Sequence, residues 1–461
     1  MKTMTIGTIM CCLFVFTSCN KWLSVSPSNE MPVEDQFGSE QGVKDALTGV
    51  YVLVKDQNLY GHTLTFGYIE NMASLWDVTA ASAEESFSQH EFDKVTGTVD
   101  QIYGKLYNAI ANVNNILEHI NADNGVLQTP GMYEIIRGEC LALRAFLHLD
   151  LMRLFGPVPC DLEAGGARLP YVKQVSKEIN LPVSYDEYKD LLLKDFYDAQ
   201  KLLKEYDPIV TGKVPVDDFL VKRTARMNYY AVKALQARAF LWYGEKENAC
   251  SAAMEVIDAR KMDGTKLFDI QGIKALFPQE DFALYPEQIF GLYDHQLDTR
   301  YSSLFRTGIL YKGNSSQEIM KKLYGNTGKD FRELYLWELL TLPNGDRYTM
   351  KKYSVGLGNK QIPLIRLSEL YFIAIETGSA EQARRLWEEY RESRVLDNKD
   401  LPVDPKLLQQ EILIEFRKEF YAEGQLFYLY KRYDSPREDI LFANSRLVVN
   451  YLLPLPKTEL K

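Results

Sequence analysis

Histidine is the side chain used most often for metal binding and for proton transfer near neutral pH. The chain has five histidines, His62, His90, His119, His148 and His295, and none of them falls in an HExxH or another local zinc pattern. A single histidine on an otherwise apolar helix is usually a core residue whose hydrogen bonds are satisfied. The sequence therefore predicts no metal site and no cofactor.

Other catalytic signatures are also missing. Residues 325–330 read Gly-Asn-Thr-Gly-Lys-Asp, but the glycines are two residues too close for a phosphate-binding loop, and Asp330 replaces the Ser or Thr that would hold magnesium. No GxSxG nucleophile elbow is present. Cys140, Cys160 and Cys250 are widely spaced without a CxxC pair, so they permit at most one disulfide.

Carboxylates near aromatic residues could form the acid pair of a glycosidase. Glu84, Glu85, Asp294 and Asp298 have such neighbours in the sequence. The distance between the two carboxyl groups decides whether such a pair works, and the sequence does not give that distance. A solvated surface explains these residues better, and catalysis has no positive support. We therefore predict that the protein is not an enzyme.

A functional group needs a scaffold, and residues 137–155 are the most informative part of it. On a helix of 3.6 residues per turn, Arg144 and His148 fall in one narrow polar seam, and Asp150 and Arg153 fall in another. The remaining surface is apolar, which is typical of a helix packed on more than one side. Four ionisable side chains exclude a membrane span. The Gly-Pro pair that follows Phe155 is expected to end this helix.

The other helical patterns predict a scaffold of helical pairs. They cover 43–54, 102–120 and 185–203, followed by three pairs: 223–243 with 247–260, 364–376 with 380–393, and 405–421 with the segment that restarts after Gly424. This format resembles tetratricopeptide repeats. The least regular part is 262–359, which contains one strand-like segment at 288–293 and many aromatic residues. The predicted fold class is mainly α: a tetratricopeptide-like scaffold of helical pairs with irregular loop and short-strand inserts.

Composition excludes some partners. The 461 residues contain 53 Lys and Arg against 63 Asp and Glu, a formal charge of −10, without any basic block. Nucleic acid and anionic lipid surfaces are therefore poor partners.

The first 18 residues are typical of a signal peptide. Lys2 provides the positive start, residues 6–16 are too short an apolar run to span a bilayer, and Thr17-Ser18-Cys19 resembles the lipobox of bacterial lipoproteins. On this interpretation Cys19 becomes the lipidated first residue, and its acyl chains anchor the protein in a membrane. The alternative is an ordinary exported protein that is cleaved elsewhere.

The whole mature chain resembles the SusD/RagB family of outer-membrane lipoproteins. The matching blocks follow in order: Cys19–Leu23, Ala46–Tyr51, Gly138–Glu139, Leu143–Ala145, Gly156–Pro159, Glu287–Phe290, Pro363–Leu370, Glu415–Phe420 and Leu453–Leu460. None of these blocks is a catalytic motif. The resemblance implies one domain over 19–461, with an N-terminal helical part (19–260), a variable insert region (261–360) and a C-terminal helical part (361–461).

The resemblance also implies a function and a location. Such a protein would be anchored in the outer membrane, facing the cell exterior, and would act as the lid of a SusC-like TonB-dependent transporter. It would capture an oligosaccharide or, alternatively, an oligopeptide. The family fixes no ligand contacts by motif, so we expect them in the aromatic stretches after the first helix and after the 288–293 strand. The candidates are Trp76, Phe87, Tyr293, Tyr301, Tyr311 and Tyr324, with Arg300 as a polar partner. For each of them, packing in the core or in a loop is the competing interpretation.

Overall fold

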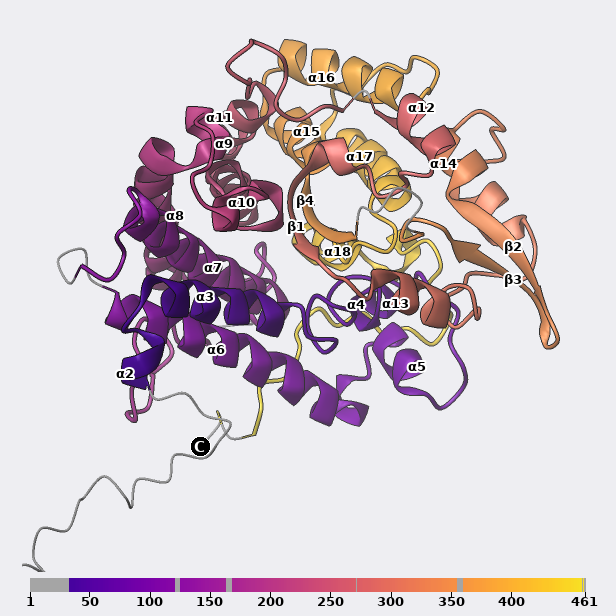
Figure 1. Cartoon of the computed structure of the whole chain (residues 1–461). Coiled ribbons are helices and arrows are strands. Elements are labelled where there is room, and N and C mark those ends of the chain that lie inside the picture. The colour runs from indigo at the N-terminus through magenta and orange to yellow at the C-terminus, as the bar shows by residue number, and fades with distance from the viewer. Residues whose placement is uncertain are drawn as a thin grey trace, which may run out of the picture.

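A computed structural model describes residues 33–120, 125–162, 168–270, 272–354, 360–457 and 459. The fold is mainly helical, as predicted (Figure 1). The α-helices are α2 (Val33–Gln36), α3 (Glu40–Val54), α4 (Tyr68–Met72), α5 (Ala83–Ser88), α6 (Thr96–His119), α7 (Met132–Phe155), α8 (Tyr185–Tyr206), α9 (Pro208–Thr211), α10 (Tyr229–Trp242), α11 (Lys246–Ile257), α12 (Ile273–Leu276), α13 (Leu297–Leu304), α14 (Phe331–Tyr335), α15 (Leu367–Thr377), α16 (Ala380–Ser393), α17 (Pro405–Glu419) and α18 (Leu426–Tyr433). Short 3-10 or π turns are η1 (Phe92–Lys94), η2 (Asp218–Leu220), η3 (Arg223–Ala225), η4 (Phe277–Gln279), η5 (Tyr285–Glu287), η6 (Gln317–Leu323) and η7 (Arg437–Asp439), and the strands are β1 (Gln288–Tyr293), β2 (Trp337–Leu342), β3 (Gly345–Met350) and β4 (Gln361–Arg366).

Helix α7 is the buried centre of the N-terminal half, and it packs between α6 and α8. Arg144 donates two hydrogen bonds of 2.7 Å to the carboxylate of Asp195 on α8. In the other seam, Arg153 donates to Asp150 one turn earlier, at 2.8 Å. These contacts confirm that the polar seams of this helix are structural. The helix ends at Phe155, before the predicted Gly-Pro stop.

The helical pairs follow one another in space although a long insert separates them in sequence. Helix α10 packs against α11, α11 against α15, and α15 against α16. Local capping fixes where these helices begin. The side chain of Asn228 accepts a hydrogen bond from Ala231 N at the start of α10, and Ser379 accepts one from Gln382 N at the start of α16. Each cap satisfies a backbone donor that has no partner within its own helix.

The insert leaves and rejoins the scaffold through a two-stranded ladder. Strand β1 pairs with β4 in antiparallel register, with Gln288 opposite Arg366 and Tyr293 opposite Gln361. The segment between them carries a second antiparallel pair, β2 with β3, which forms a hairpin that projects at one edge of the molecule (Figure 1). The ladder therefore closes the insert at its base and leaves the hairpin free to form a surface.

A buried network of charges, which we name the ion-pair core, joins the base of the insert to α16 and α17. Its members are Glu287, Asp330, Arg332, Lys352, Arg366, Arg394, Glu415, Glu419 and Glu423. Arg366 donates to Glu287 at 3.0 Å and to Glu419 at 2.8 Å, and Arg394 donates to Glu419 at 2.6 Å. Burial raises the pKa of Glu419, but Arg394 and Arg366 outweigh burial and hold this pKa well below its ordinary value.

Two details differ from the sequence prediction. Residues 364–366 belong to strand β4 rather than to a helix, because they pair with β1. The first helix of the first pair begins at Tyr229 rather than at 223, because Asn228 caps it. Within the described residues, no helix is long and apolar enough to cross a membrane.

Candidate ligand-binding cleft

A cleft of about 500 Å³ opens beside the tip of the β2–β3 hairpin, and we name it the hairpin cleft. Its walls come from the insert, from the hairpin tip and from the chain after η7. Its polar lining is Asp77, Lys312, Asn314, Glu318, Lys322, Asn344, Asp346 and Arg347, and its aromatic lining includes Tyr311 and Phe442. Three cations thus face three carboxylates, so the lining has no net charge.

Backbone hydrogen bonds fix one wall of the cleft. Asp77 N donates to Tyr311 O at 2.9 Å, and Gly313 N donates back to the Asp77 carboxylate at 2.8 Å. On the other side, Lys312 N donates to Tyr348 O, and Tyr348 N donates to Gly313 O. The segment therefore lies alongside β3 as a short added strand. Its position is set before any ligand arrives, which lowers the entropic cost of binding.

The two aromatic rings are half-buried, and each has a cation on one face. The Arg347 guanidinium lies 4.4 Å from the ring centroid of Tyr311, and Lys312 Nζ lies 4.5 Å from that of Phe442. Arg347 also donates to Gly308 O at 2.5 Å, so its planar group is held in place. Burial lowers the pKa of Lys312, and its ion pair with Asp77, at 2.9 Å, offsets part of this effect.

Several polar groups of the cleft have no partner among the described residues. The side chains of Asn314, Asn344 and Asp346 are exposed and form no hydrogen bond or ion pair with any part of the chain that the structure describes. An amide offers both donors and acceptors, and a carboxylate accepts hydrogen bonds. Next to partly exposed rings, these groups suit a ligand that has apolar faces edged by hydroxyl groups.

Three of the predicted ligand-binding residues lie in the core instead. Trp76, Phe87 and Tyr324 are at most 2% exposed. The indole of Trp76 donates to Phe66 O at 2.8 Å, and Phe87 stacks on Tyr68 with centroids 4.6 Å apart. Their rings offer no free face to a ligand in this structure, because packing already covers them.

Tyr301 and Arg300 are also engaged in the protein. Tyr301 is 7% exposed, and its hydroxyl donates to Glu338 at 3.3 Å. Arg300 donates to the buried carboxylate of Asp294 at 2.5 Å, and Lys55 approaches the same carboxylate at 3.5 Å. Asp294 thus forms ion pairs with both cations within the protein.

Tyr293 lies in a different depression, which we name the Tyr293 groove. This groove of about 530 Å³ runs between α3, the segment η2–η3 and the end of β1. Tyr293 is 50% exposed, with Lys222 Nζ 5.5 Å from its ring centroid. Val52 and Val221 provide exposed apolar walls. The groove and the hairpin cleft share no lining residue, so of the predicted candidates only Tyr311 lies in the cleft.

Sequence reasoning missed Asp77, Asp346, Arg347 and Phe442. Asp77 directly follows Trp76, which anchors this loop in the core. The hairpin tip had a usable signal, because Pro343-Asn344-Gly345 is a turn sequence between two runs of strand-forming residues. For Phe442 no local signal exists.

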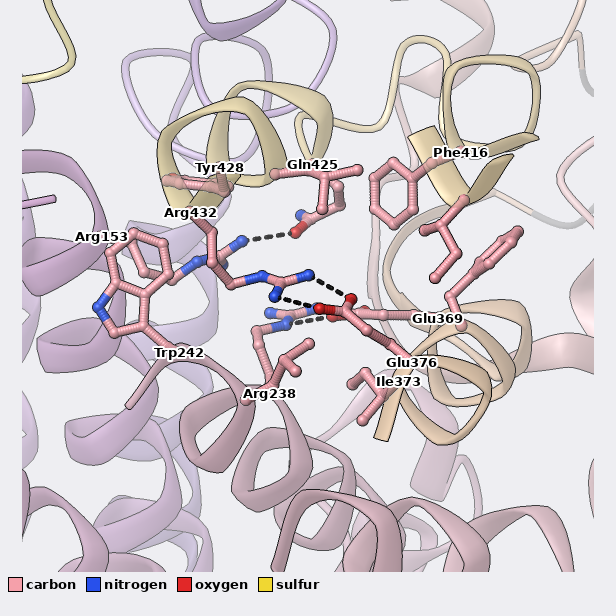
Figure 2. A pocket seen from close by; sticks show the side chains of 14 residues that line it. Arg153, Arg238, Trp242, Glu369, Ile373, Glu376, Phe416, Gln425, Tyr428 and Arg432 are labelled. Atoms are coloured by element: carbon pink, nitrogen blue, oxygen red, sulfur yellow. Dashed lines mark hydrogen bonds and ion pairs between the residues drawn. The ribbon is translucent and has the colours of Figure 1, made fainter. Parts of the chain in front are cut away.

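A third pocket is enclosed by α10, α15, α17 and α18 (Figure 2). Its volume is only about 50 Å³. Figure 2 shows its arginines paired: Arg238 with Glu369 at 2.7 Å, and Arg432 with Glu376 at 2.6 Å. This pocket has room for no more than a few water molecules, and its charges hold the helices together.

Comparisons with known proteins show which of them share part of this sequence and this mainly helical fold. Residues 21–212 match a SusD-like family described as "Starch-binding associating with outer membrane". A SusD-like protein of Formosa agariphila is 22% identical over 169 residues, which cover 34% of this chain and about a third (31%) of that relative. A SusD homologue from Bacteroides thetaiotaomicron has a TM-score of 0.72 at 14% identity, over 94% of this chain and 97% of the other.

A laminarin-binding SusD-like protein also has this fold, with a TM-score of 0.63 at 15% identity over 92% of this chain and 97% of the other. Residues 21–212 are thus similar to a SusD-like family, and the whole described chain has the fold of SusD-like structures.

Proposed function

We propose that this protein captures an oligosaccharide at the hairpin cleft and delivers it to a transporter. The observation that carries the proposal is the combination of two partly exposed rings, Tyr311 and Phe442, with fixed or unpartnered polar groups on the same walls. Sugar rings have apolar C–H faces that stack on aromatic rings, and their hydroxyl groups need donors and acceptors at the edge. The description of the matched family as starch-binding and the laminarin-binding structural neighbour support the same ligand class.

The location and partner are part of this proposal. Cys19 lies outside the described residues, and its lipidation would anchor the chain in the outer membrane, facing the cell exterior. Residues 19–461 would act as one domain, the lid of a SusC-like TonB-dependent transporter. Co-purification of such a transporter with the lipidated protein from outer membranes tests the partner, and loss of membrane attachment in Cys19→Ala tests the anchor.

The expected affinity is modest. Covering roughly 50 Å² of apolar sugar face contributes about 1 kcal/mol at 25 cal/mol per Å². Two such contacts with a few hydrogen bonds, less the cost of association, give dissociation constants between about millimolar and micromolar. Retention of the ligand would then require closure against the transporter.

Calorimetry with a panel of neutral and acidic oligosaccharides tests the ligand class. Tyr311→Ala should weaken binding, whereas Tyr293→Ala serves as the matched control, because Tyr293 is a partly exposed tyrosine in the other depression. If Tyr293→Ala abolishes binding and Tyr311→Ala does not, the cleft assignment is wrong. A response to oligopeptides and to no glycan would establish peptide capture instead. Release of shortened sugars from a bound glycan would show a hydrolase.

A further inference from the structure

The loop 174–182, before α8, presents aliphatic side chains to solvent. Ile179 is 88% exposed, Leu181 is 75% exposed and Val175 is 52% exposed. Three large aliphatic residues exposed within seven positions differ from the scattered apolar residues of an ordinary surface. The side chains of this loop therefore suit a contact surface from which water is excluded.

The loop is held at both ends, so its position relative to the scaffold is defined. Val172 N donates to His148 Nε2 of α7 at 3.0 Å, and Val175 N donates to Glu118 of α6 at 2.8 Å. At the far end, Val183 N donates to Leu169 O at 3.2 Å. The aliphatic tip between these points is thus held against α6, α7 and the segment around Leu169.

The same end of α6 receives the start of the described chain. The ring of Phe37, directly after α2, stacks on His119 with centroids 4.5 Å apart, and His119 is the neighbour of Glu118. Figure 1 shows α2 at the edge of the molecule beside α6. Val33, the first described residue, is itself 51% exposed. The chain toward the anchor therefore leaves the body near the aliphatic loop.

Length and charge indicate what this surface faces. Cys19 precedes Val33 by 14 residues, so an extended chain between them spans no more than about 50 Å. The charged groups of the loop, Lys177 and Glu178, balance each other. Around the loop, Asp100, Arg168 and Glu459 line the same depression as Ile179 and Leu181, and Glu118 is engaged with Val175 N. A neutral aliphatic loop near a lipid tether fits the boundary between lipid head groups and acyl chains better than it fits a charged protein surface.

We propose that the loop 174–182 inserts Ile179 and Leu181 into the membrane interface and fixes the orientation of the anchored protein. This inference rests on the lipid anchor of the proposed function. The orientation keeps the α2 end against the bilayer and turns the opposite side, where α16 and α17 lie, away from it (Figure 1).

The test uses a fluorophore that reports water exclusion, attached to a cysteine introduced by Ile179→Cys. Cys160→Ser removes the exposed native thiol, and Val403→Cys is the matched control, because Val403 is also 88% exposed and lies two residues before the start of α17. The lipidated full-length protein is reconstituted in phosphatidylcholine vesicles. A blue shift and brighter emission at position 179, but not at 403, support the proposal. Emission typical of water at both positions overturns it.

Two further measurements distinguish a failure of the lipid anchor from a failure of the loop to contact the membrane. If the protein does not float with the vesicles, anchoring fails. The loop is then judged from Cys19→Ala protein mixed with the same vesicles, where a blue shift at position 179 supports membrane contact and its absence refutes it. Leu181→Ser should reduce any shift seen at position 179. If the shift appears only when a transporter is added and never with lipid alone, the loop contacts protein, and the membrane proposal is wrong.

Discussion

The ion-pair core and the hairpin cleft use the same residue types for opposite purposes. Both combine arginine and lysine with carboxylates. In the core, Arg332, Arg366 and Arg394 are at most 2% exposed and bind several carboxylates each. In the cleft, Asp346 and Asn344 are exposed and bind no part of the described chain.

The difference lies in whether the polar groups are already satisfied. A buried, fully paired group costs a great deal to disturb, because its partner is left as an unpaired charge away from water. An exposed, unpartnered group costs little to remove and is free to bind a ligand. The same substitution should therefore affect stability in one region and affinity in the other.

The largest effect is expected from Arg394→Met. This change leaves the buried carboxylates of Glu287 and Glu419 without one of their partners, so the free energy of unfolding should fall by about 3–5 kcal/mol. Urea unfolding followed by circular dichroism measures the loss. Arg446→Met is the control, because the side chain of Arg446 is 69% exposed in its ion pair with Glu85. Loss of this exposed pair should lower the free energy of unfolding by less than about 1 kcal/mol. Equal losses in the two variants would refute the comparison.

The next largest effect is the pH dependence that His148 gives to the free energy of unfolding. Burial lowers its pKa to about 3, and its Nε2 accepts a hydrogen bond from Val172 N, so the folded protein keeps this imidazole neutral. An unfolded histidine titrates near pH 6.5, so its contribution to stability is present above that pH and is lost as the pH falls toward 3. At pH 5 the loss is about 2 kcal/mol.

His148→Asn should lower stability at pH 7 but flatten its decline between pH 7 and 5. His295→Asn is the control at an exposed histidine and should leave the slope of the wild type unchanged. Unfolding curves collected at four pH values measure both slopes. The half-buried His62 and the buried His90, each with a pKa lowered by burial to about 4, are present in both variants and do not affect the difference. An unchanged slope in His148→Asn would contradict the prediction.

The scaffold could be predicted from the sequence because its signals are local. The seams of α7 and the stop after Phe155 follow from spacing within one helix. Strand β4 was partly predicted as helix because a short apolar run fits both structures, and its partner β1 lies about 70 residues away. The β2–β3 hairpin was overlooked within the irregular third.

The cleft was predicted only as a region. Whether an aromatic ring is exposed depends on packing between distant segments, which a sequence window does not contain. Trp76 and Asp77 show this most clearly: the indole fills the core, and the next residue binds the cleft wall. The role of Tyr311 in ligand binding stays a prediction.

Tyr311→Ala should weaken glycan binding about tenfold, which corresponds to about 1.4 kcal/mol of lost stacking. Tyr311→Phe keeps the ring and should bind within about threefold of the wild type, or within about 0.7 kcal/mol. Calorimetry gives both affinities, and urea unfolding shows whether the fold is intact. A large loss of stability in Tyr311→Ala would show that Tyr311 stabilises the fold, and its role in ligand binding would then be refuted.

The smallest effect should come from Asp346→Asn, and the same change at Asp330 serves as its buried comparison. Asp346→Asn alters an exposed, unpaired carboxylate, so the free energy of unfolding should change by no more than about 0.5 kcal/mol. The substitution removes one negative charge, so the net charge of the cleft lining rises from zero to +1. This change should favour an acidic oligosaccharide over a neutral one by a few fold, and by less at high salt. Asp330→Asn is the buried counterpart. Because Asp330 accepts hydrogen bonds from Arg332 at 2.7 and 3.0 Å, the same chemical change there should destabilise the protein strongly and leave sugar preference unchanged. If the two variants behaved alike, burial and pairing would not be what separates the scaffold from the site.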